Sequence, residues 1–201
     1  MGGVANVSTA ATAVIAVIAL NTWKQQSKTQ NITVFLDKLT DEVHEYLQTM
    51  TTPVQVLKII EIALKCYTPQ LDDAYKNNTH ANVISYITKK GKSDSILLFD
   101  SLNKCNQSKA KIQSLLAKGQ IYNFEKYIDC YNSCQMLLWQ HDRLQVVAAV
   151  IGSDSMNWDN PLVQNSIDNM LSVNSDDVQK HFSEQHIKYL EFTKANYHAA
   201  Y

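Results

Sequence analysis

The sequence predicts an all-α protein, in which an N-terminal membrane-spanning or long apolar helix continues into an antiparallel bundle or irregular array of about six helices. Three observations predict this fold class. Apolar residues recur at helical spacing along most of the chain, glycine and proline number only five and three, and aromatic and β-branched residues show no useful alternation with period two. A sheet needs both frequent turns and that alternation, so we expect no sheet.

The size and charge of the chain restrict its class further. Its 201 residues suffice for one ordinary domain and an appendage, which we expect to be an apolar N-terminal helix (residues 1–23) and a single helical domain (residues 24–201). The formal net charge of −1 argues against a general nucleic-acid-binding protein. We therefore expect no nucleic acid among its partners.

The first element is an uncharged apolar helix. No charged side chain occurs before Lys24, and residues 4–20 consist mostly of alanine, valine and isoleucine. From Val4 to Trp23 such a helix is roughly 30 Å long, the thickness of a bilayer core. Trp23, Lys24 and Lys28 are typical of a membrane–water interface, and the lysines place the bulk of the chain in the cytoplasm. We expect a single-pass membrane anchor in contact with the lipid bilayer.

Two features of this segment add other interpretations. Alanine dominates it, and polar residues such as Asn6 and Thr9 oppose insertion, so the alternative is a helix buried in a soluble bundle. Ser8, Thr12 and Ala16 recur every four residues, a spacing that lets two membrane helices approach closely. This stripe indicates self-association within the bilayer.

The later helices are predicted from their terminal residues. The apolar spacing of residues 34–50 is expected to continue the first helix without a break, and the polar stretch 103–111 predicts a bend. Polar caps, several followed by proline, predict helix starts at Thr52-Pro53, Thr68-Pro69, Ser93, Asn160-Pro161 and Asn174-Ser175. Glycines predict helix ends at Gly91, Gly119 and Gly152.

A long helix predicted from about Ile121 to Ile151 carries a heptad seam. Its members alternate three and four residues apart: Tyr127, Cys130, Cys134, Leu137, His141, Leu144, Ala148 and Ile151. Such a seam packs against a partner helix. We expect His141 to be a hydrogen-bonded polar residue that fixes the register.

The four cysteines are the candidate metal ligands. Cys130 and Cys134 lie one turn apart and could hold one ion, and Cys66 and Cys105 could complete four thiolates. Zinc motifs have tighter spacing than this, and free cysteine commonly packs as a small apolar residue. Core packing is therefore the favoured interpretation, and we expect no cofactor.

Two other groups of residues are candidates for contacts. In the loop 153–159, Met156 and Trp158 could contact a partner protein, since tryptophan is the commonest hot-spot residue; the favoured alternative is that Trp158 packs back on the following helix. On the last helix, His181 and His186 point about 140° apart, so we expect both at the surface.

The sequence contains no P-loop, nucleophile elbow, HExxH or dinucleotide fingerprint, so we expect no enzymatic activity. The layout suggests a non-enzymatic, membrane-anchored module that binds another protein, for example in a bacterial membrane or defence complex. Two alternatives stay open. One is a soluble helical immunity or inhibitor protein, and the other is a membrane-acting effector whose first helix oligomerises.

Overall fold

The computed structural model describes residues 3–66 and 79–200, with side chains for 15–66 and 79–197, and this part of the chain consists of helices and short connections. The predicted all-α class is confirmed, since no strand occurs among the described residues. In chain order the elements are α1 (Gly3–Cys66), α2 (Ala81–Tyr86), the π-helical turn η2 (Ile87–Gly91), α3 (Lys92–Asn103), α4 (Asn106–Gly119), α5 (Tyr127–Ile151), α6 (Pro161–Leu171) and α7 (Ser175–Ala200).

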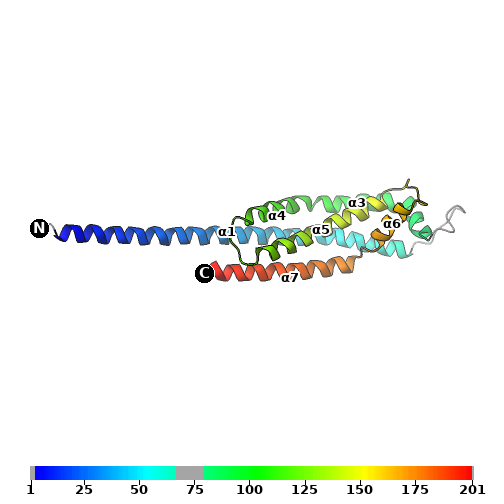
Figure 1. Cartoon of the computed structure of the whole chain (residues 1–201). Helices are drawn as coiled ribbons and strands as arrows, with labels where there is room; N and C mark the ends of the chain where they lie inside the picture. The colour runs from blue at the N-terminus through cyan, green and yellow to red at the C-terminus, as the bar shows by residue number, and fades with distance from the viewer. Residues whose placement is uncertain (1–2, 67–78, 201) are drawn as a thin grey trace.

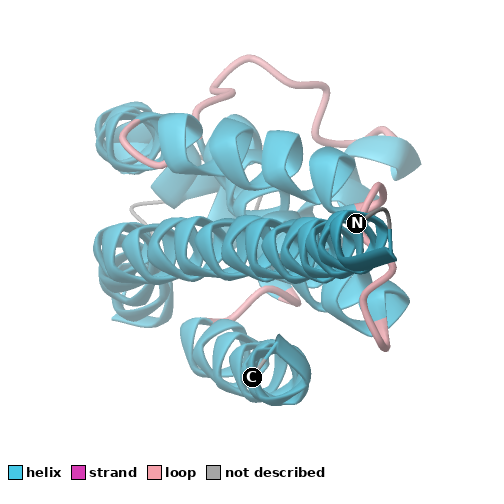
Figure 2. Cartoon of the chain, turned by 90° about the vertical axis from the view of Figure 1, so that its left-hand side faces the viewer, coloured by secondary structure: helices cyan, strands magenta, loops and turns pink. Residues whose placement is uncertain are grey.

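The helices form an antiparallel bundle whose layers alternate in direction (Figure 1). The second half of α1 leads away from the N-terminus, α3 and α4 return in line with each other, α5 leads away again, and α7 returns. α5 packs most extensively against α7 and α3, and α1 packs against α7, α4 and α3. Seen from the N-terminal side, the other helices gather around α1 (Figure 2). α6 covers the opposite end of the bundle (Figure 1).

The buried face of α1 is a second heptad seam. Its buried residues alternate three and four apart: Leu36, Leu39, Val43, Tyr46, Met50, Pro53, Leu57 and Ile60. Pro53 therefore lies inside one helix of 64 residues, and the helix start predicted at Thr52-Pro53 is wrong. Proline removes one backbone hydrogen bond from the helix. The seam residues before and after Pro53 are buried, and their packing keeps the helix continuous. The start predicted at Thr68-Pro69 lies outside the described residues.

Gly91 does not end a helix, and Ser93 does not begin one, contrary to the sequence predictions. α2, η2 and α3 follow one another directly, and the backbone at Gly91 is right-handed helical. A Cβ atom at Gly91 would lie 2.0 Å from the carbonyl oxygen of Ile151, the last residue of α5. Gly91 is therefore needed because the backbone of α5 approaches it closely. The local sequence does not reveal this contact, since Ile151 lies in a distant part of the chain.

The remaining boundaries follow the sequence more closely. The chain bends between α3 and α4, within the predicted polar stretch, and α4 ends at Gly119. α5 begins at Tyr127 instead of Ile121, because the residues between them form a loop. The starts predicted for α6 and α7 are confirmed: Oδ1 of Asn160 accepts the N–H of Leu162 at 2.9 Å, and Oδ1 of Asn174 accepts that of Asp177 at 2.8 Å.

Candidate interaction surface

The N-terminal part of α1 projects from the bundle as a single helix, which we call the arm and define as residues 3–31 (Figure 1). At 1.5 Å per residue it is about 40 Å long. Every side chain from Ile15 to Gln26 is exposed. The exposed fractions of its large apolar side chains are 65% for Ile15, 58% for Val17, 59% for Ile18, 51% for Leu20 and 64% for Trp23.

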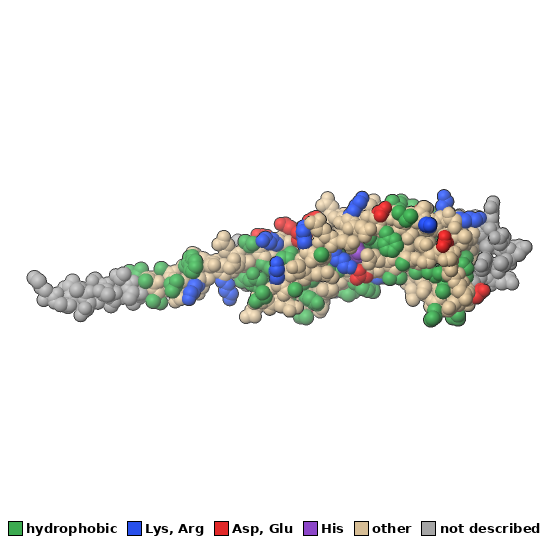
Figure 3. All heavy atoms as spheres, turned by 90° about the horizontal axis from the view of Figure 1, so that it is seen from above, with side chains coloured by type: hydrophobic (Ala, Val, Ile, Leu, Met, Phe, Trp, Pro, Cys, Tyr) green, Lys and Arg blue, Asp and Glu red, His purple; other side chains and the backbone are tan. Residues whose placement is uncertain are grey.

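The apolar side chains of the arm surround the helix instead of forming one face. Successive residues turn by about 100°, so Ile15, Val17, Ile18 and Leu20 point in four different directions. Figure 3 shows hydrophobic side chains along the narrow described part of the arm, followed by lysines. A helix that is apolar all round is normally enclosed by protein or by lipid. The arm therefore needs a cover that the bundle does not supply.

A polar collar, which we define as residues 21–31, separates the apolar part of the arm from the bundle core. Trp23 is its one large apolar residue, and Lys24 and Lys28 are its charged residues; all three are exposed. The first fully buried residues after the collar are Phe35 and Leu36. The apolar arm and the apolar core are thus two separate surfaces of one helix.

No helix in the described part of the chain is both long and apolar enough to cross a membrane. The side chains of residues 1–14, which form most of the predicted anchor, lie outside that description, and so do Ser8 and Thr12 of the predicted self-association stripe. The third member, Ala16, is exposed on the arm. The described residues therefore give the transmembrane prediction no support.

The loop between α4 and α5, residues 120–126, packs against α1 next to the collar. The rings of Tyr122 and Phe124 lie 5.1 and 5.3 Å from that of Phe35, measured between centroids. Asn196 of α7 holds the other side of the loop: its Oδ1 accepts the N–H of Glu125 at 3.1 Å, and its Nδ2 donates to the Glu125 carbonyl at 3.1 Å. The loop is thereby fixed at the end of the bundle from which the arm projects.

A groove of about 370 Å³ lies where the arm joins the bundle. Gln25, Lys28 and Thr29 line it on the α1 side, and Tyr122 and Asn123 line it on the loop side. These side chains supply hydrogen-bond donors, acceptors and one ammonium group, but no pair of acid and base. The groove therefore presents polar side chains to the solvent at the base of the arm.

The outer face of α5 carries an exposed apolar stripe that sequence analysis missed, and we call it the α5 stripe. It consists of Met136, Trp139 and Val146, whose exposed fractions are 38%, 46% and 55%. The guanidinium of Arg143 lies 4.8 Å from the centre of the Trp139 ring. Tryptophan and arginine are favoured at protein interfaces, so this stripe offers a second contact surface. With Arg143 between Trp139 and Val146, the steps are three, four and three residues, which was the available sequence signal.

Trp158, the tryptophan that the sequence offered as a partner contact, is 6% exposed and belongs to the hydrophobic core. Met156 is partly buried against the same core. Trp158 is therefore buried within the bundle. Its ring offers little surface to a partner protein.

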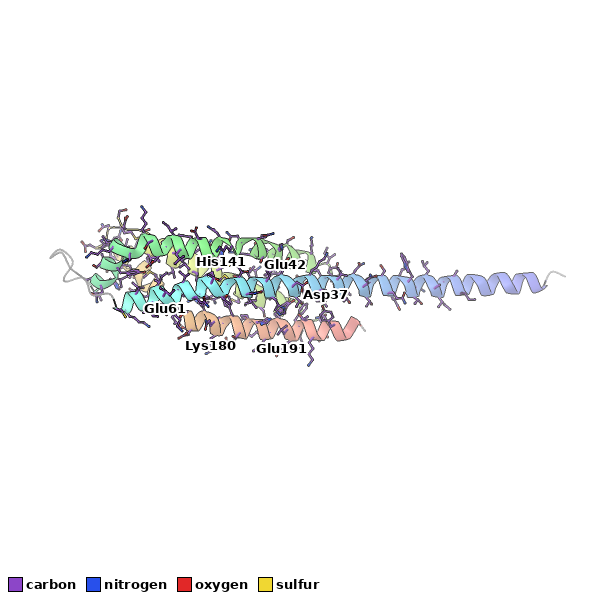
Figure 4. All side chains as sticks on the ribbon, turned by 180° about the vertical axis from the view of Figure 1, so that it is seen from behind. Asp37, Glu42, Glu61, His141, Lys180 and Glu191 are labelled. Carbon is purple, nitrogen blue, oxygen red and sulfur yellow. The ribbon has the colours of Figure 1, made fainter. Side chains whose placement is uncertain are left out.

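The heptad seam of α5 is buried, as predicted, and His141 lies within it, fully buried (Figure 4). Its Nε2 lies 3.2 Å from the Leu102 carbonyl oxygen, and its Nδ1 lies 3.4 Å from Nζ of Lys109. Burial, with the nearby Lys109 charge, lowers the pKa of His141. The neutral ring can thus donate from Nε2 to Leu102 and accept at Nδ1 from Lys109, which connects α5 to α3 and α4.

The four cysteines do not form the metal site considered from sequence. Cys66 is exposed, whereas Cys105, Cys130 and Cys134 are buried. Among the described residues, no group of three or more His, Cys, Asp or Glu side chains is placed to hold a metal ion. Burial raises the pKa of Cys105 to about 11. The hydrogen bond with Cys134, together with burial, raises the pKa of Cys130. These protonated thiols pack as small apolar groups.

The structure brings together two histidines that the sequence did not pair. The Nε2 atoms of His44 on α1 and His186 on α7 lie 3.1 Å apart, and their rings meet edge to face. Burial, with the proximity of His44, lowers the pKa of His186. His181 and His186 are both partly exposed. The contact between His44 and His186 connects α1 and α7.

An apolar cavity of about 230 Å³ lies between α1, α5 and α6. Its titratable lining residues are Glu61 and Lys65. Glu61, labelled in Figure 4, accepts hydrogen bonds from the backbone N–H and the hydroxyl of Ser175, where α7 begins. A carboxylate at a helix N-terminus stabilises the helix. Glu61 therefore has a structural role at the start of α7.

Comparison of the chain with protein-family models, with curated proteins and with solved structures found no match. The geometry itself thus defines the class: an antiparallel helical bundle that extends one apolar helical arm.

Proposed function

We propose that the protein is a non-enzymatic, membrane-anchored helical protein that binds another protein. In this proposal the arm enters the bilayer and the bundle stands at the membrane surface. The observation that carries the proposal is the uncovered apolar arm, with five large side chains at least half exposed. Burying such a side chain is favourable by about 1.5–3 kcal/mol, so an apolar surrounding stabilises the arm substantially.

Lipid fits the arm better than a groove on a partner protein does. A helix that docks in a groove needs apolar residues on one face, at spacings of three and four. The arm instead has them all round, and the sequence from Val4 to Leu20 contains no charge. That helical segment is about 25 Å long, close to the thickness of about 30 Å of a bilayer core.

The collar supports one orientation of the chain. Trp23, Lys24 and Lys28 follow the apolar segment at once, where an aromatic ring and ammonium groups suit the headgroup layer. A lysine excess on the bundle side favours a cytoplasmic bundle. The collar is about 16 Å long at helical rise, enough to pass through the headgroup layer.

The bundle supplies the protein-binding part of the proposal. The α5 stripe combines an exposed tryptophan with a stacked arginine. Association through an apolar surface is what these groups can perform.

Membrane extraction of the full chain tests the anchor. We expect wild-type protein to stay in carbonate-washed membranes and the variant with Ala11→Glu and Ala13→Glu to be released, since these positions lie at the middle of the uncharged segment 4–20, and a charge near the bilayer centre costs about 2.5–3.5 kcal/mol. The matched control, with Gln25→Glu and Gln26→Glu, adds the same charge in the exposed collar and should stay in the membrane. Release of the wild type would contradict the anchor and favour the soluble inhibitor.

Co-purification from solubilised membranes tests the α5 stripe. We expect Trp139→Ala to lose the protein that co-purifies with the wild type. Leu162→Ala is the matched control, because Leu162 is a 73% exposed apolar residue on α6. Equal recovery of the same protein with both variants would show that the α5 stripe is not the contact.

A further inference from the structure

Two histidines from different helices bring their Nε2 atoms together at the surface of the bundle. The Nε2 atoms of His44 on α1 and His186 on α7 lie 3.1 Å apart. The ring centres are 5.1 Å apart, so the two nitrogens are the parts of the rings that face each other. An imidazole nitrogen binds zinc at about 2.0–2.1 Å, so two nitrogens on one ion lie about 2.9 Å apart at a right angle and about 3.3 Å apart at the tetrahedral angle. The separation in the bundle falls between these two values.

The packing of α1 against α7 sets the positions of the two rings, since these helices run side by side along the bundle (Figure 1). Oγ1 of Thr40 and the hydroxyl of Tyr189 lie 2.8 Å apart, one turn away from the pair on each helix, and Tyr189 is fully buried. Further along the same two helices, the hydroxyl of Tyr197 donates to Asp37. These contacts fix the register of α1 against α7. Because the helices bring both histidines together before an ion arrives, binding needs little further ordering.

The histidine pair is accessible from solvent and has a carboxylate one helical turn away. His44 is exposed and His186 is partly exposed, so an ion can reach both nitrogens. Asp41 is an exposed residue one turn before His44 on α1, and a nearby negative charge favours a cation. As the side chains lie, no third His, Cys, Asp or Glu joins the pair in the described part of the chain. Water therefore occupies the remaining positions around a bound ion.

We propose that His44 and His186 form a surface site for one divalent ion of the zinc, nickel and copper class, which links α1 to α7. Imidazole suits these ions, whereas Mg²⁺ and Ca²⁺ prefer oxygen ligands. With the ion bound, both rings carry their hydrogen on Nδ1, so the ring that donates in the metal-free pair changes to its other neutral tautomer. The ion ties α7 to the helix that continues into the arm. This site does not depend on whether the arm enters a membrane.

Thermal unfolding of the full chain in a mild detergent tests the site. Every protein compared carries Cys66→Ser, which removes the exposed thiol as a competing ligand. We expect zinc chloride, and not magnesium chloride, to raise Tm by about 3–6 °C when Zn²⁺ is about tenfold above its Kd. His44→Gln and His186→Gln should lose this rise, because one imidazole alone cannot chelate the ion. His181→Gln is the matched control and should keep it, since Nδ1 of His181 contacts the Asp177 carbonyl of its own helix.

Equilibrium dialysis of the folded proteins against zinc chloride gives the second readout. We expect the Cys66→Ser protein and the His181→Gln control to bind one Zn²⁺ per chain with the same Kd. In His44→Gln and in His186→Gln the Kd should rise about tenfold or more. The change in Tm is measured with and without Zn²⁺ in each variant, so a general loss of stability does not imitate the expected result.

Two outcomes would overturn the site. One is a Cys66→Ser protein that binds no zinc, and the other is equal zinc binding by His44→Gln, His186→Gln and the His181→Gln control. Either result leaves the anchor standing, because carbonate extraction tests the anchor separately.

Discussion

Substitution of Gly91 by alanine should destabilise the protein, although alanine is the better helix former. In a helix interior the change normally stabilises by about 1 kcal/mol. Here the new Cβ would lie 2.0 Å from the oxygen and 3.1 Å from the carbon of the Ile151 carbonyl. Both are backbone atoms, so no side-chain rotation relieves the clash. Reaching ordinary contact requires α3 and α5 to separate by about 1.4 Å.

The expected magnitude follows from these opposing effects. Overpacking costs about 1–3 kcal/mol, and a 2.0 Å approach to backbone belongs at the upper end of that range. Subtracting the helical gain of about 1 kcal/mol leaves a net loss of about 2 kcal/mol. For a chain of this size the loss lowers Tm by roughly 4–8 °C. Thermal unfolding followed by far-ultraviolet circular dichroism in a mild detergent measures it. Lys92→Ala, at the exposed next residue, is the control and should change Tm little. A Gly91→Ala variant that is more stable than the wild type would refute the close approach of α3 and α5.

Three other changes test separate parts of the bundle. Pro53→Ala should raise Tm, because a proline inside a helix costs about 3 kcal/mol and the lost packing of its ring is smaller; a lower Tm would mean that the proline starts a helix. The lowered pKa of His186 means that the unfolded chain binds its proton more tightly, so stability is present above pH 6.5 and falls as the pH drops below it. His186→Gln or His44→Gln should flatten this dependence, measured by urea unfolding across the pH range, and an unchanged slope would contradict the pair. Maleimide should modify one thiol of the native chain, at Cys66, and Cys134 only after unfolding; rapid labelling of the Cys66→Ser variant would contradict the buried cysteines.

The sequence predicted correctly those helix boundaries that are set by contacts between residues close together in the chain. Asn160 and Asn174 accept backbone hydrogen bonds from residues two and three positions ahead, so the cap and its partner lie in one short segment. Pro53 and Gly91 misled the prediction because their surroundings come from distant parts of the chain. The seam of α1 keeps Pro53 within a helix, and the end of α5 requires Gly91 to lack a side chain.

The candidate surfaces were predictable to different degrees. The uncharged arm follows from composition alone, and the structure adds that residues 15–26 are fully uncovered. The sequence alone does not show which tryptophan, Trp139 or Trp158, is exposed to a partner. A loop tryptophan next to a helix start can turn inward or outward, so the tertiary packing decides. The meeting of His44 and His186 depends on the register of α1 against α7, which neither helix specifies alone.

The continuity of α1 explains how one helix can serve both the bundle and the arm. Each helix end leaves four N–H or four C=O groups without intrahelical partners. Ending α1 at the collar would leave such groups without intrahelical partners between the arm and the bundle. One helix of 64 residues avoids those ends, and the seam from Leu36 to Ile60 supplies the tertiary contacts that hold it folded. The collar accordingly contains no glycine or proline that would end a helix. A continuous helix of this kind holds the arm in one direction relative to the bundle.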